Sequence, residues 1–165
     1  MRIKIALITV LMAFNVNADD FKLVDRTISL PLPSKWLAKS PEKNSLVFFD
    51  ASAKNPRLII SVYPAPFIFP GPNVSEFESI YEKEKVDWEK SVEASRTEKP
   101  QFSYDSSKKT ATIKYFFEFQ GNSFEERVRF YDCGNGDGMA IKAMIPKSVT
   151  VPDSLSQAFE APLCK

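Results

Sequence analysis

Residues 110–133 read TATIKYFFEFQGNSFEERVRFYDC, and this stretch decides the fold of the chain. Apolar and polar side chains alternate through most of it, which is typical of strands that bury one face. Gly121-Asn122 interrupts the alternation and favours a two-residue hairpin turn with glycine in the first position. The sequence therefore predicts two antiparallel strands, 110–120 and 123–133.

This turn also predicts the register of the hairpin. The expected cross-strand neighbours are apolar on both strands, which supports the pairing: Phe119 with Phe124, Tyr115 with Val128, and Ile113 with Phe130.

Glu126 is the exception, because the predicted register directs it at the core face, opposite Phe117. A lone carboxylate there costs free energy unless it is paired or hydrated. Two interpretations stay open. In the first, Glu126 lines a pocket or has a raised proton affinity. In the second, the sheet face is open there, or a bulge turns the side chain outward.

The same periodicity predicts further elements on both sides of the hairpin. The expected strands are 27–32, 45–50, 57–63, 101–105 and 139–145. Because of its prolines, the first of them is either an edge strand or ends there. A long helix is expected from Val74 to about Arg96, capped by Asn73 or Ser75. One stripe carries its apolar side chains: Val74, Phe77, Tyr81, Trp88 and Val92, with Ile80 at the margin.

A short helix is expected after Pro152, with Leu155 and Phe159 directed inward. The order of elements predicts an α+β fold, in which an antiparallel sheet is covered by one long helix and a short C-terminal helix.

This order resembles the PsbP-like and DcrB-like families, and so does the stretch ISLPLPSKW at residues 28–36. The resemblance covers about residues 27–159. It implies an α/β/α sandwich of PsbP-like type. It also implies an accessory, chaperone-like or binding protein rather than an enzyme.

The first eighteen residues have the pattern of an export signal. Arg2 and Lys4 precede an apolar run over residues 5–14, and Ala18 supplies a small residue at the cleavage position. The apolar run is shorter than the roughly 20 residues needed to span a bilayer. The sequence therefore predicts a signal peptide over 1–18, one globular domain over 19–165, and a periplasmic or secreted location with no membrane anchor after cleavage.

Cys133 and Cys164 are the two cysteines of the chain. In an exported protein they are expected to form one disulfide. Closing this loop would stabilise the fold by roughly 3 kcal/mol in the chain-entropy model.

Composition excludes several classes of function. The sequence has no histidine, so it holds neither a Ser-His-Asp nor a Cys-His arrangement and no histidine-ligated zinc. With 22 basic and 21 acidic residues, the chain has no basic excess for nucleic acid. Residues 132–138, DCGNGDG, are rich in oxygen ligands but lack the spacing of a calcium loop. No metal or cofactor is predicted.

Residues 64–72, PAPFIFPGP, cannot form a helix or a central strand. Phe67, Ile68 and Phe69 in this segment are the candidates for binding a protein partner. In the alternative interpretation they cap the core between helix and sheet. The long helix that follows carries an excess of acidic side chains, which is either a surface for a basic partner or a solvated face.

The favoured function is an exported, periplasmic, non-catalytic protein-binding domain. It would act as an immunity-type inhibitor or as an accessory factor for a protein of the cell envelope, without binding nucleic acid. Two alternatives stay open: a carrier of a small molecule or lipid, and a carboxylate-dependent hydrolase that uses Glu126.

Overall fold

The structure is a computed structural model that describes residues 19–23, 26–33, 36–40, 44–161 and 163–164. The signal peptide predicted over 1–18 lies outside the described residues. Strands β1 (Asp19–Leu23) and β2 (Arg26–Leu30) form a separate hairpin.

The remaining strands form one antiparallel sheet of eight strands. They are β3 (Trp36–Lys39), β4 (Leu46–Asp50), β5 (Ile59–Pro64), β6 (Ser95–Arg96), β7 (Gln101–Asp105), β8 (Thr110–Phe119), β9 (Asn122–Gly134) and β10 (Asp137–Pro146). Their order is β3-β4-β5-β10-β9-β8, and both β6 and β7 pair with the outer side of β8.

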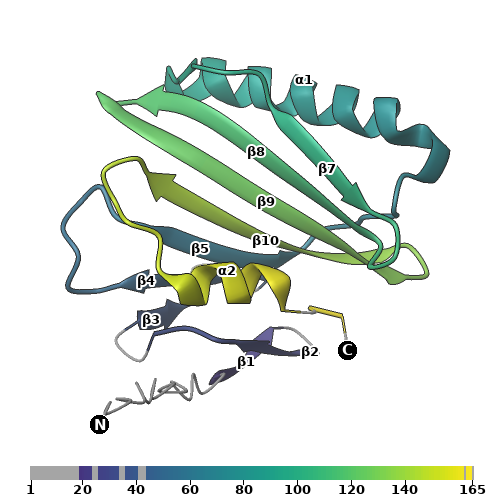
Figure 1. Ribbon diagram of the computed structural model, residues 1–165, viewed down its shortest axis with the longest axis horizontal. Helices are drawn as coiled ribbons and strands as arrows, with labels where there is room; N and C mark the ends of the chain where they lie inside the picture. Colours follow the sequence, from purple (N-terminus) through teal and green to yellow (C-terminus); the bar gives the residue numbers. More distant parts are fainter. Residues whose placement is uncertain (1–18, 24–25, 34–35, 41–43, 162, 165) are drawn as a thin grey trace, which may run out of the picture.

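Two helices lie on opposite faces of this sheet (Figure 1). The long helix α1 (Val74–Val92) follows a short 3-10 turn, η1 (Gly71–Asn73), and the short helix α2 (Asp153–Glu160) follows β10. The predicted α+β fold is confirmed, with its antiparallel sheet, long helix and short C-terminal helix.

The larger core lies on the α2 face, where the β1–β2 hairpin also packs. Leu155 and Phe159 of α2 are buried there, as predicted. They join apolar side chains from the hairpin and from β4, β5 and β10, which include Ile28, Leu30, Phe48, Ile60 and Ile141.

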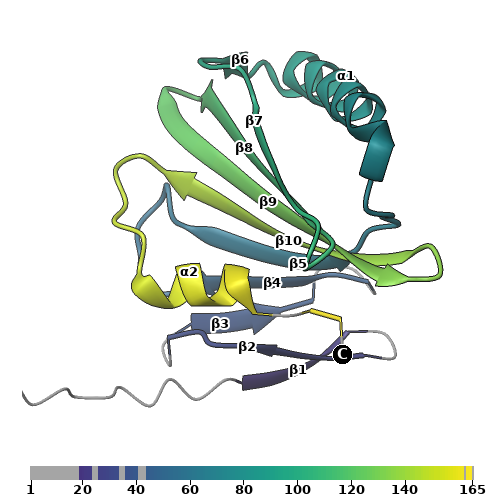
Figure 2. The same cartoon turned by 45° about the vertical axis from the view of Figure 1, so that its right-hand side comes forward.

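On the other face of the sheet, contacts between aromatic rings hold α1 in place. Trp88 of α1 packs edge-on against Phe117 of β8 at 5.0 Å between ring centroids, and Phe117 stacks on Phe124 of β9. Further along, Tyr81 packs edge-on against Phe102 of β7. The helix therefore covers β7, β8 and β9, whereas no described helix lies over β3, β4 and β5 on this face (Figure 2).

The predicted register of the β8–β9 hairpin was wrong by two residues. The turn is Gln120-Gly121 rather than Gly121-Asn122, so Phe117 faces Phe124 and Tyr115 faces Glu126. Both turn residues have positive φ, 49° and 73°, which is the type I′ geometry that suits a twisted hairpin. A shift of two residues leaves every side chain on its predicted face.

The predicted start of α1 at Val74 is confirmed, but its predicted end near Arg96 was wrong. The helix stops at Val92 because Glu93 takes the left-handed conformation, with φ 58°, and donates its N–H to the Glu89 carbonyl. At the other end, Asn73 makes no side-chain capping bond, since the 3-10 turn leads directly into the helix. Strands β1, β3 and β6 were not predicted, and β6 occupies residues that were expected to end the helix.

The predicted disulfide is confirmed. Cys133 near the end of β9 is bonded to Cys164 in the tail after α2. It indicates an oxidising compartment. Among the helices of the described residues, none has the length and apolar character needed to cross a membrane.

Removing the disulfide should lower stability without changing the fold. The Cys133→Ser/Cys164→Ser variant should lose about 3 to 4 kcal/mol in free energy of unfolding, because the crosslink closes a loop of 31 residues. Urea denaturation of the variant and of the reduced parent would measure this, and the two should agree. An unchanged midpoint would mean that other contacts hold the tail.

Candidate functional site

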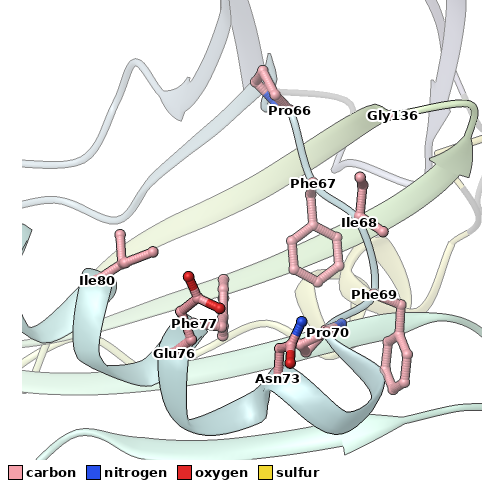
Figure 3. A pocket seen from close by; sticks show the side chains of 10 residues that line it. All are labelled: Pro66, Phe67, Ile68, Phe69, Pro70, Asn73, Glu76, Phe77, Ile80 and Gly136. Atoms are coloured by element: carbon pink, nitrogen blue, oxygen red, sulfur yellow. The ribbon is translucent and has the colours of Figure 1, made fainter.

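An open groove of about 540 Å³ lies between the segment after β5 and the start of α1 (Figure 3). Phe67, Ile68 and Phe69 stand on one side, and Phe77 and Ile80 stand on the helix. Glu76 is the single charged side chain among the described residues that line it. The groove is therefore an apolar surface with one acidic position at its rim.

The three predicted binding residues occupy different positions. Phe67 is buried, 5% exposed, and its ring lies 5.4 Å from that of Phe77 and 5.3 Å from that of Phe130. Ile68 is 68% exposed. Phe69 is half-buried, with its ring 6.4 Å from that of Tyr104. Phe67 thus serves the core, as the alternative interpretation expected, whereas binding through Ile68 stays a prediction.

Close packing at Gly138 fixes the path of this segment. The Ala65 N–H donates to the Gly138 carbonyl at 3.0 Å. A Cβ at position 138 would lie 2.4 Å from the Ala65 oxygen and 2.8 Å from the Phe67 nitrogen. No real side chain tolerates such distances, so only glycine lets the segment cross β10 here.

Asp132 holds the far end of the same segment. One carboxylate oxygen accepts the Phe69 N–H at 3.1 Å, and the other accepts the Gly134 N–H at 2.8 Å. These two hydrogen bonds hold the pKa of Asp132 below its usual value. Asp132 thus has a structural role within residues 132–138, and the described residues contain no cluster of three or more histidine, cysteine or acidic side chains placed to bind a metal.

Ile80 was predicted only as a margin position of the helix stripe, and it is 54% exposed at the groove. The acidic excess of α1 is smaller at the surface than the sequence indicated. Glu78 accepts from Tyr104 at 3.0 Å, and Arg96 pairs with both Glu82 and Glu89. Of the six acidic side chains in α1, three are exposed: Glu76, Glu84 and Asp87.

Glu126 lies beneath α1 and is 3% exposed. Its carboxylate forms an ion pair with Lys85 and accepts the Tyr81 hydroxyl at 3.2 Å. The inward direction predicted for Glu126 is confirmed, and the open-face alternative is wrong. The Lys85 ammonium also lies 5.0 to 5.5 Å from the ring centroids of Tyr81, Trp88 and Tyr115.

Burial perturbs this cluster electrostatically. It lowers the pKa of Lys85, and the nearby Glu126 carboxylate opposes that shift. It raises the pKa of Tyr63, which lines the same cavity, to about 12, with the charges of Glu126 and Glu84 adding to the effect. The cavity beside the ion pair is small, at about 270 Å³.

No protein-family model matches the chain, and no curated protein matches it significantly. Solved structures with distant similarity include one from Bacteroides thetaiotaomicron VPI-5482, at 14% identity and a TM-score of 0.41, covering 74% of this chain and 40% of that one. Another is PA94, a Pseudomonas aeruginosa protein of unknown function, at 11% identity and a TM-score of 0.42, covering 80% and 85%. This chain thus spans less than half of the Bacteroides protein.

The Lys85–Glu126 pair can be tested by a double-mutant cycle. Glu126→Leu should destabilise the protein by about 3 to 5 kcal/mol, because it leaves a buried ammonium unpaired. Lys85→Met/Glu126→Leu should regain most of that loss, since three aromatic rings already surround the lysine. Lys83→Met, at an exposed position of the same helix, is the control. Additive losses in the double variant would contradict the pairing.

Alkaline pH should unfold the protein as its tyrosines ionise. All five tyrosines have raised pKa values, chiefly through burial, with Tyr63 and Tyr131 at about 12. Because the unfolded phenols ionise near pH 10, the buried tyrosines make their full contribution to stability below that pH. The free energy of unfolding should then fall as the pH rises from about 10 to 12. Phenolate absorbance and circular dichroism should change together. A tyrosine that ionises near pH 10 in the folded protein would contradict this.

Proposed function

We propose that this chain is an exported, periplasmic, non-catalytic protein-binding domain of PsbP-like or DcrB-like type. The observation that carries the proposal is the exposure of Ile68 and Ile80, 68% and 54%, beside one apolar groove. Large apolar side chains at that exposure, gathered around a concave surface, are typical of protein interfaces.

The groove defines the chemistry of the partner. An apolar side chain would enter between Ile68 and Ile80 and remove both from water. Glu76 lines the groove, and Glu84 is exposed one helical turn beyond Ile80. A basic residue next to the inserted apolar side chain would therefore complement this rim.

The anchoring of the segment supports binding without a large rearrangement. Phe67 is packed in the core, and hydrogen bonds to Gly138 and Asp132 fix the residues on either side of Ile68. Holding an exposed side chain in its bound position reduces the entropy lost on association.

The two alternatives receive less support. The cavity between α1 and the sheet, at about 270 Å³, is smaller than the roughly 300 Å³ from which ligand pockets usually begin. Glu126 is already engaged by Lys85 and Tyr81, so a hydrolase would have to break a buried ion pair to use it.

Two features support the proposed compartment. The pattern of residues 1–18 is that of a signal peptide, and the Cys133–Cys164 disulfide fits an oxidising compartment. The partner then belongs to the cell envelope, or is a toxin that reaches it.

Site-specific crosslinking in the periplasm of a Gram-negative host tests the proposal. A photo-crosslinking residue at position 68 should give one discrete product with a partner protein. Ile80→Ser should remove that product. Position 37 provides the control, because Leu37 is also exposed, at 48%, but lies on β3 and does not line the groove. Phe67 is left unchanged because it is part of the core.

Two results would contradict the proposal. Equal crosslinking from positions 68 and 37 would show that exposed apolar residues react without specificity. A product with twice the mass of the chain would assign the groove to self-association.

A further inference from the structure

A polar cleft of about 320 Å³ lies on the face of the sheet that carries α2. Strands β7, β8 and β9 form its floor, and α2 forms one wall. Its described lining includes three cations, Lys114, Arg127 and Arg129, against one carboxylate, Glu160. Hydroxyl groups come from Ser103, Thr112 and Ser156.

The strand register brings the cations together. Lys114 of β8 lies directly opposite Arg127 of β9, and Thr112 lies opposite Arg129 in the next row. Like charges directly opposite each other on neighbouring strands repel. This arrangement costs stability unless an anion lies between the cations.

The protein's own carboxylates neutralise the cleft only in part. Arg127 donates twice to Glu125, and Arg129 donates to Glu160 at 2.6 Å. Lys114 forms no ion pair or hydrogen bond through its side chain with any residue that the structure describes. Arg129, only 6% exposed, keeps its Nε without a hydrogen-bond partner in that same part of the chain. The cleft therefore keeps a net positive charge, and Lys114 is the cation in its lining that has no carboxylate partner among the described residues.

We propose that this cleft binds a tetrahedral oxyanion, a phosphate or sulfate group, with Lys114 as its principal contact. Donors approach from three elements: Lys114 and Thr112 on β8, Arg127 on β9 and Ser156 on α2. A planar carboxylate offers two oxygens to such an arrangement. A tetrahedral group offers three or four in different directions, as lysine, arginine and hydroxyl donors require.

This site is independent of the protein-binding groove. The two lie on opposite faces of the sheet and share no lining residue. Failure of either proposal therefore leaves the other standing. The oxyanion could be free in the periplasm or be part of a lipid headgroup, and the test separates these sources.

Titration of the mature protein with inorganic phosphate, followed by calorimetry and amide NMR, tests the site. Binding should be saturable, with shifts on β8 and β9. Lys114→Gln should weaken it about tenfold or more, the loss of one charge-assisted contact. Lys90→Gln is the control, because Lys90 is exposed on α1 across the sheet. Circular dichroism should stay unchanged in both variants.

Co-sedimentation with vesicles identifies the source. Binding to vesicles that contain phosphatidic acid, absent with pure phosphatidylcholine and lost in Lys114→Gln, would assign the site to a lipid headgroup. Phosphate binding without co-sedimentation would assign it to a soluble phosphate. The proposal is overturned if phosphate does not saturate the protein, or if Lys90→Gln weakens binding as much as Lys114→Gln does.

Discussion

The geometry of the candidate interface depends on the missing side chain at Gly138. Because the backbone of residues 65–67 lies within van der Waals contact of that glycine, the segment can cross β10 and turn back toward α1. This crossing directs Phe67 into the core and leaves Ile68 facing solvent. The Asp132 carboxylate then fixes Phe69. An apolar residue is thus held at the surface by contacts that are themselves buried.

Different interactions stabilise the two faces of the sheet. On the α1 face, aromatic rings supply most of the contact, and the Lys85–Glu126 pair compensates the one carboxylate that the strand alternation places inside. On the α2 face, apolar side chains fill the centre, and β8 and β9 carry cations that the neighbouring carboxylates only partly offset. The candidate binding sites therefore lie beside the two helices, at the surface, rather than in the core between helix and sheet.

Much of the fold could be predicted from the sequence because its signals are local. Alternation gave the main strands, and the 3.6-residue period gave α1. The predicted hairpin register was wrong because Gln120 adopts a positive φ. Residues other than glycine rarely do so, and the sequence therefore favoured a turn that begins at Gly121. Strands β1 and β3 are short, and their pairing with β2 and β4 decides their conformation more than local pattern does.

The candidate site was predicted in outline only. Residues 64–72 were identified from their prolines and aromatic side chains, yet the sequence could not say which of the three side chains turns outward, since Gly138 decides this from a distant strand. The partners of Glu126 and Arg129 likewise come from elements far away in the chain. Contacts between elements that are distant in the chain leave no periodic pattern in the sequence.

The most direct measurement is crosslinking from position 68 in a Gly138→Ala variant whose far-ultraviolet circular dichroism shows that the sheet and both helices persist. The added methyl group must displace residues 65–67, so the partner product should fall strongly even though Ile80 and the helix are untouched. Crosslinking at the parent level would contradict the account, because it would show that the placement of this segment on β10 does not matter for binding.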